Sequence, residues 1–100
     1  MSVRLVQIAP GQEQVFTLEE GKTTLGRNSD NQIQLVFGSV SRHHVKLTVT
    51  GESCRLEDMG SSNGTRVNGR TSTGIDLKDG DEIGIGECVF RFEHVQDSES

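Results

Sequence analysis

Apolar and polar residues alternate with period two along most of the chain, a pattern typical of β-strands that bury one face. The alternation is clearest over residues 45–49 and 88–92. No window repeats apolar residues at the i, i+3, i+4 spacing of an amphipathic helix, so we expect essentially no helix. Shorter runs with strand character lie at residues 3–8, 15–18, 23–25, 33–35, 54–57, 65–67 and 82–86.

Glycine-containing turns separate these runs. Asn63-Gly64 and Asn68-Gly69 are dipeptides typical of type I′ hairpin turns, and they bracket the short run 65–67. About ten short strands, with turn signals roughly every 8–12 residues, predict an all-β fold of two packed sheets.

Composition supports one domain with a thin aliphatic core. Hydrophobic residues make up 31% of the 100 residues, and the only aromatic residues are four phenylalanines. We expect the domain to span residues 1–95, followed by an acidic polar tail or the start of a linker at 96–100. Cys54 and Cys88 occupy apolar positions of strand-like runs, so we expect both to be buried and reduced.

Charge is distributed unevenly. The net charge of −5 argues against binding of duplex nucleic acid, which usually needs a strongly basic face. Residues 22–70, however, carry seven Lys or Arg against four Asp or Glu, a balance of +3, while the remainder carries −8. A basic island inside an acidic protein favours a small anionic ligand over an extended polyanion.

The sequence contains no apolar run long enough to cross a membrane and no N-terminal segment typical of a signal peptide. We therefore expect a cytoplasmic domain without membrane contact.

Three polar loops lie within the basic island, at residues 26–27, 41–44 and 60–65. The Arg27 guanidinium offers a rigid fork of donors that matches phosphate or carboxylate oxygens. Ser41 places a hydroxyl beside the cation of Arg42, and the third loop adds hydroxyl, amide and backbone donors. These residues favour a composite anion site, although solvated loop side chains would give the same pattern.

Four motifs resemble the signature of the forkhead-associated (FHA) domain. They are LGR at 25–27, SRHH at 41–44, DMGSSNGTRVNG at 58–69 and LKDGDEI at 77–83. The resemblance runs from about residue 5 to residue 92, with the motifs in the family's order and spacing. It implies an eleven-stranded antiparallel β-sandwich whose loops at one end bind phosphothreonine peptides.

The resemblance also implies roles for individual residues. Arg27 is similar to the arginine that contacts the phosphate, and Ser41 to the serine that hydrogen-bonds it. Arg42 occupies a variable position that often adds a phosphate contact, and Ser62 resembles the hydroxyl residue at the phosphate. Asn63 resembles the asparagine that holds the peptide backbone after the phosphothreonine.

Other residues are expected to shape the loops. Glycine suits positions with positive φ or close packing, and a buried histidine usually has a hydrogen-bonded partner. We expect His43 to be exposed. Arg66 and Arg70 are either plain surface charges or cations that attract acidic residues near the phosphosite. The expected loop-shaping residues are Gly26, His44, Gly64, Thr65 and Asn68.

Two other kinds of function are alternatives to phosphopeptide binding. Ser41, His43 or His44, and Asp58 supply the residue types of a catalytic triad, but no GxSxG elbow is present. Adjacent histidines on a strand point to opposite faces and cannot share a metal, so we expect no enzyme, metal or cofactor. The remaining alternative is a phospho-independent interaction or dimerisation module with the same fold.

The expected partner is a phosphothreonine-containing protein that a Ser/Thr kinase has modified. Because domains of this family usually lie inside larger proteins, we also expect this chain to be part of a multidomain protein.

Overall fold

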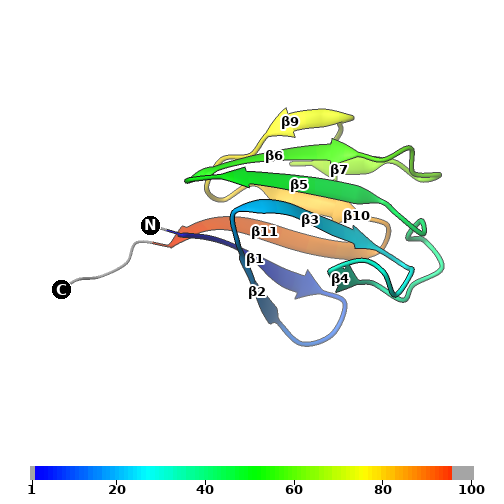
Figure 1. The fold of residues 1–100 in the computed structure, drawn as a ribbon. Helices are drawn as coiled ribbons and strands as arrows, with labels where there is room; N and C mark the ends of the chain where they lie inside the picture. The colour runs from blue at the N-terminus through cyan, green and yellow to red at the C-terminus, as the bar shows by residue number, and fades with distance from the viewer. Residues whose placement is uncertain (1, 96–100) are drawn as a thin grey trace.

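Two β-sheets pack face to face in the computed structural model, which describes residues 2–95 (Figure 1). The predicted tail at 96–100 lies outside the described residues. The strands are β1 (Ser2–Ala9), β2 (Gln14–Leu18), β3 (Gly21–Gly26), β4 (Ile33–Gln34), β5 (Val45–Thr50), β6 (Ser53–Asp58), β7 (Thr65–Val67), β8 (Arg70–Thr71), β9 (Gly74–Asp76), β10 (Glu82–Ile85) and β11 (Cys88–Val95).

One sheet has six strands in the order β2-β1-β11-β10-β7-β8, and the other has five in the order β4-β3-β5-β6-β9. The prediction of a two-sheet sandwich of about eleven strands is confirmed. One pair departs from the antiparallel pattern, because β4 runs parallel to β3. Within residues 2–95 no segment forms a helix that could cross a bilayer.

The core consists of alternate strand residues from the two inner faces. Leu5 lies opposite Phe92 in the six-stranded sheet, and Leu47 lies opposite Leu56 in the five-stranded sheet. All four side chains are at most 1% exposed. Both cysteines are buried and free, as predicted. Burial of these side chains is the main favourable contribution to folding.

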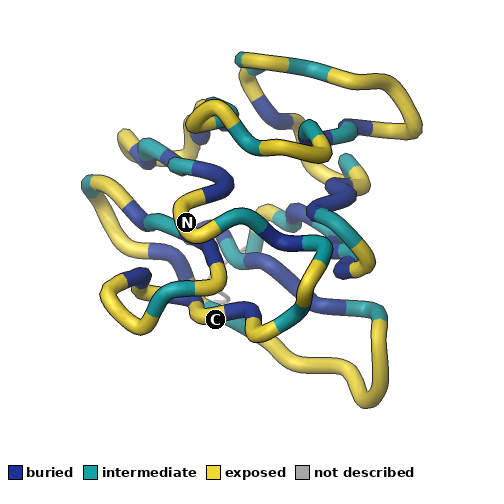
Figure 2. Tube along the Cα trace, turned by 90° about the vertical axis from the view of Figure 1, so that its right-hand side faces the viewer, coloured by how far each residue is buried: buried dark blue, intermediate teal, exposed yellow. Residues whose placement is uncertain are grey.

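The three polar loops of the basic island, at residues 26–27, 41–44 and 60–65, meet at one end of the sandwich. The register places Thr65, the first residue of β7, opposite Ile85, the last residue of β10. It likewise places Val45, the first residue of β5, opposite both Leu25 near the end of β3 and Asp58 at the end of β6. Figure 2 views the molecule from this end and shows exposed and half-buried loops around the buried strand ends.

The opposite end of the sandwich holds both ends of the described chain. Ser2 at the start of β1 pairs with Val95 at the end of β11. Because these strands are central neighbours in one sheet, the polypeptide enters and leaves the fold on the side away from the loops (Figure 1).

The two Asn-Gly turns differ from each other. Asn68 and Gly69 both have positive φ, at 53° and 83°, as a type I′ turn between β7 and β8 requires. At Asn63-Gly64 only the glycine has positive φ, so the prediction of a type I′ turn there is wrong. The physical reason is that β6 and β7 belong to different sheets, and a two-residue hairpin turn cannot link them.

Candidate functional site

Backbone hydrogen bonds hold the first two loops together. The N–H of Arg27 donates to the carbonyl oxygen of Ser41 at 2.9 Å, and the N–H of Asn28 donates to that of Arg42 at 3.2 Å. These bonds join the two loops beyond the paired part of β3 and β5. As a result the backbone places Arg27 directly beside Ser41, although fourteen positions of sequence separate them.

Gly26 is needed where these loops meet. A Cβ atom at this position would overlap the carbonyl oxygen of Arg42 and would lie 2.8 Å from Nδ2 of Asn31. Only glycine allows the two backbones to approach so closely.

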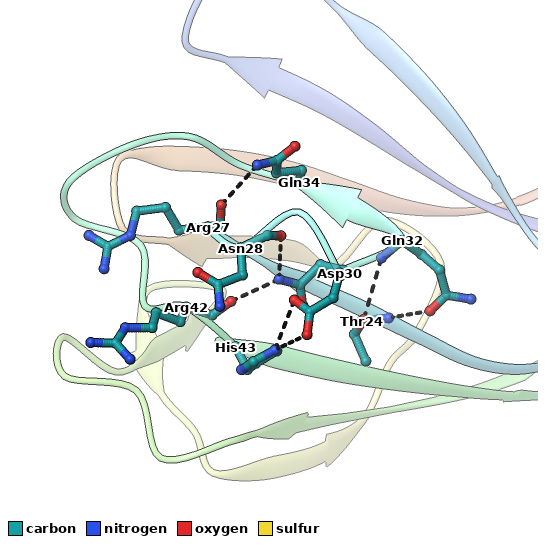
Figure 3. Close-up of polar contacts among 9 residues, drawn as sticks. Thr24, Arg27, Asn28, Asp30, Gln32, Gln34, Arg42 and His43 are labelled. Carbon is teal, nitrogen blue, oxygen red and sulfur yellow. Dashed lines mark hydrogen bonds and ion pairs between the residues drawn. The ribbon is translucent and has the colours of Figure 1, made fainter.

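Asn31 connects the same two loops from the interior of the protein. Its side chain is buried, and its Nδ2 donates to the carbonyl oxygens of Asn28 and Arg42, each at 2.8 Å. The sequence alone does not single out this residue, because an asparagine in a polar turn cluster carries no signal of burial. Figure 3 shows this network, together with the bond from Gln34 Nε2 to the Arg27 carbonyl oxygen at 3.1 Å.

His43 and Asp30 form an exposed ion pair beside the network. Nε2 of His43 lies 2.9 Å from Oδ2 of Asp30. The hydrogen bond and charge of the imidazole lower the pKa of Asp30. Figure 3 shows this pair apart from the guanidinium groups of Arg27 and Arg42, which both extend to the other side of the loops.

His44 joins the second loop to the third. The ring is fully buried, and its Nδ1 accepts the N–H of Ser41 at 3.1 Å. Its Nε2 lies 2.9 Å from the carbonyl oxygen of Gly64, and since a carbonyl can only accept, Nε2 carries the proton. The ring therefore fixes the position of Ser41 relative to the loop that contains Ser62 and Asn63.

Asp58 organises the third loop. Its Oδ1 accepts the N–H groups of Gly60 and Ser61 at 2.8 Å, and its Oδ2 accepts the hydroxyls of Ser61 and Thr65 at 2.6 Å. Burial by itself would raise the pKa of Asp58, but these four hydrogen bonds outweigh it and lower the pKa to about 2. The carboxylate is thus the centre around which residues 58–65 turn.

The polar groups at the surface of the loops retain unused hydrogen-bonding capacity. The Ser41 hydroxyl accepts the N–H of Ser62 at 3.0 Å, which leaves its own hydrogen available for donation. Nδ2 of Asn63 donates to the carbonyl oxygen of Ser39 at 2.9 Å, and the Oδ1 of the same amide can still accept.

These groups surround a small hollow of about 80 Å³. Two larger hollows, of about 380 and 540 Å³, lie along the lateral edges of the sandwich. We favour the small one as the functional site, because only there do an arginine, hydroxyls and an amide converge from three loops. Its lining consists of Arg27, Gly38, Ser39, Val40, Ser41, Ser62 and Asn63.

Four of the predicted contact residues, Arg27, Ser41, Ser62 and Asn63, line the hollow together. Arg42 does not line it, but follows Ser41 and extends an exposed side chain from the same loop.

The predicted loop-shaping residues lie at different places. Gly26, His44, Gly64 and Thr65 lie behind the hollow, in the contacts described above. Asn68 lies at the far end of β7, where its side chain bonds Asp81 and the N–H of Glu82 at 3.0 Å each. The structure therefore does not bring Asn68 to the site.

Comparison with known proteins agrees with this architecture. Residues 23–86 match the family model of the FHA domain. The FHA domain-containing protein FhaA of Mycobacterium tuberculosis is 36% identical over 88 residues, a match that covers 86% of this chain and 17% of FhaA. The chain therefore spans less than a fifth of the length of that relative.

Two solved structures show the same fold. Mycobacterium tuberculosis EmbR in complex with a low affinity phosphopeptide has a TM-score of 0.85 at 34% identity, with 99% of this chain and 26% of that chain covered. The yeast Dun1 FHA domain in complex with a doubly phosphorylated peptide has a TM-score of 0.78 at 27% identity, with 99% and 78% covered.

The His44 bridge predicts an asymmetry between the two adjacent histidines. We expect His44→Ala to lower the free energy of unfolding by about 2–4 kcal/mol, because it leaves a cavity and two buried polar groups without partners. His43→Ala removes only an exposed ion pair and should change it by less than about 1 kcal/mol. Urea denaturation of both variants measures the difference, and equal effects would contradict the bridge.

Asp58 predicts loss of stability in acid. The pKa of Asp58 is about 2 in the folded state and 3.8 ordinarily. Its contribution to the free energy of unfolding is therefore full above pH 3.8 and is lost as the pH falls through 2. After allowance for solvent screening, the free energies of unfolding of wild type and Asp58→Asn should differ by about 1–2 kcal/mol at pH 6, and most of this difference should be gone at pH 2. Denaturation across that range tests it, with Asp76→Asn, at the exposed last residue of β9, as the control. A gap independent of pH would disprove the role of Asp58.

Proposed function

Because the chain belongs to the FHA domain family, we propose that it is a non-catalytic module that binds phosphothreonine in partner proteins. The observation that carries this proposal is the convergence of Arg27, Ser41, Ser62 and Asn63 on one hollow from three separate loops. The solved phosphopeptide complexes of EmbR and Dun1 share this fold, which supports the same kind of ligand here.

The electrostatics of the hollow suit a phosphate. A phosphorylated side chain carries about −1.5 to −2 charges at neutral pH and three strong acceptor oxygens. In residues 2–95, neither Arg27 nor Arg42 lies within 4 Å of a carboxylate, so both guanidinium charges are available. We propose that Arg27 contacts the phosphate, that the hydroxyls of Ser41 and Ser62 donate to it, and that Arg42 adds charge at the rim.

Asn63 suits the main chain of the ligand. Because its Nδ2 is held by the Ser39 carbonyl oxygen, the amide has a fixed orientation, and its Oδ1 can accept a peptide N–H. An amide fixed in this way adds little entropic cost when it binds. We propose that Asn63 binds the peptide backbone next to the phosphothreonine.

The arrangement of the candidate triad residues supports a binding role without catalysis. The His44 ring accepts from the backbone N–H of Ser41, not from its hydroxyl, and the Asp58 carboxylate bonds Gly60, Ser61 and Thr65. A nucleophile needs its base at the hydroxyl itself.

The wider setting of the domain is part of the proposal. We propose that residues 1–95 are the FHA domain of a longer cytoplasmic protein that responds to Ser/Thr kinases, and that 96–100 begin a linker. The longer chains of relatives such as FhaA support this, as does their description as FHA domain-containing proteins.

Removal of the Arg27 guanidinium should abolish or strongly weaken binding. Charge-assisted hydrogen bonds contribute roughly 1.5–3 kcal/mol each, so Arg27→Ala should weaken phosphothreonine-peptide binding at least about tenfold. Isothermal calorimetry measures the change, and circular dichroism verifies the fold. Arg55→Ala is the matched control, because Arg55 pairs with Asp76 on the five-stranded sheet, away from the hollow.

Unchanged affinity in Arg27→Ala would overturn the site assignment. Binding of a natural partner that survives phosphatase treatment would favour the phospho-independent module instead.

The hollow also predicts a preference for phosphothreonine over phosphoserine. One buried methyl group accounts for about 0.8 kcal/mol, or roughly fourfold. A shaped pocket between the loops of Ser41 and Asn63, with Val40 as its apolar wall, should add to this by fixing the side-chain rotamer. We expect a difference above fourfold in calorimetry with peptides that differ only in this residue. Equal binding would show that no such pocket exists.

A further inference from the structure

The tip of the β10–β11 hairpin is joined to the rim of the hollow. The Ser39 hydroxyl donates to Oε1 of Glu87 at 3.0 Å and accepts the N–H of Glu87 at 2.9 Å. Gly86, with φ of 59°, lies so close to Ser39 that a Cβ atom at position 86 would be 2.6 Å from the Ser39 hydroxyl oxygen. The hairpin tip is therefore fixed against the second loop and is not a free turn.

Ser39 links this tip to the site. It lines the hollow together with Arg27, and its carbonyl oxygen accepts the hydrogen bond from Asn63. The Glu87 carboxylate is thus two hydrogen bonds away from the amide proposed to hold the peptide backbone. A peptide bound at Asn63 would have Ser39 and Glu87 beside it on the same rim.

The site therefore carries charges of both signs. Arg27 and Arg42 provide exposed positive charge, and Glu87 provides an exposed carboxylate that Ser39 joins to the hollow. Among residues 2–95, Glu87 has no Lys or Arg within 4 Å. A cation also lies at this hairpin, because Nη2 of Arg66 donates to the carbonyl oxygen of Gly86 at 3.1 Å. That bond holds Arg66 at the hairpin backbone, so it reduces the negative potential of the tip without pairing with Glu87.

We propose that Glu87 makes the site selective for phosphothreonine peptides that carry Lys or Arg shortly after the phosphothreonine. This inference rests on the proposed function. An extended chain advances about 3.3 Å per residue, so the second to fourth positions after the phosphothreonine span about 7–13 Å along the peptide and are the positions to test. An acidic residue in the same place meets the like charge of Glu87.

The expected effect is modest and depends on salt. Exposed ion pairs of this kind change affinity about two- to fivefold, and salt screens them over about 10 Å at 0.1 M. Peptides with Lys should therefore bind about two- to fivefold more tightly than peptides with Gln, and those with Glu more weakly still. The differences should shrink at high salt.

The experiment uses three sets of phosphothreonine peptides, with Lys, Gln or Glu placed in turn at the second, third and fourth positions after the phosphothreonine. Fluorescence anisotropy measures the affinity of wild type, Glu87→Gln and Glu87→Lys. Glu87→Gln keeps an acceptor for Ser39, so it removes the charge and preserves the contact. It should abolish the preference and leave affinity for the Gln peptides unchanged, while Glu87→Lys should reverse the preference.

Two control variants separate the role of Glu87 from general electrostatics. Glu52→Gln removes one negative charge, as Glu87→Gln does, but at the opposite end of the sandwich. It should leave the preference for Lys unchanged. Arg66→Gln removes the cation at the hairpin and should increase the preference for Lys.

The outcomes distinguish this inference from the proposed function. If wild type binds no phosphothreonine peptide, both are overturned. If it binds them without a preference for Lys, or if the preference persists in Glu87→Lys, the role of Glu87 is overturned and phosphothreonine binding stands.

Discussion

The binding end of the domain depends on one buried imidazole. His44 accepts from the backbone of Ser41 on one loop and donates to the backbone of Gly64 on another. The ladder between β5 and β6 ends where Val45 pairs with Asp58, and the ring joins the two loops beyond that point. Because the ring is completely enclosed, both hydrogen bonds form in a poorly polarisable medium where an unpaired group would be costly. The ring holds the serine hydroxyl and the asparagine amide of the site in place together with the bonds from Ser62 to Ser41 and from Asn63 to Ser39.

The site combines a rigid backbone with exposed charged side chains. Asn31 and Asp58 bind backbone groups of the loops from within the fold, whereas Arg27 and Arg42 extend from the same loops into solvent. Asn31 and Asp58 thus fix the geometry without being proposed to meet the ligand, and Ser41 and Asn63 are themselves held by bonds to Ser62 and Ser39. Such a division keeps donors in place before binding, which lowers the entropic cost of recognition.

Much of the fold could be predicted from the sequence because its determinants are local. Period-two alternation indicated the strands, and the four motifs indicated the family and the loops. The backbone of Asn63 was predicted wrongly, because a dipeptide preference cannot reveal that its flanking strands lie in different sheets. Asn31 and Glu87 gave no signal, since their contacts with Arg42 and Ser39 join residues 11 and 48 positions apart. Long-range polar contacts of this kind become visible only in three dimensions.

The pairing of Ser2 with Val95 has a consequence for how the domain can be connected to other domains. Entry and exit points that lie side by side allow a domain to be inserted into a loop of another protein, or attached through either flank, with the same outcome. In each case the protein that carries the domain would lie at the end with Ser2 and Val95, and the ligand would lie at the end with the loops. The fold would then act as a spacer about as long as its strands, and a bulky partner could dock without colliding with the protein that carries the domain.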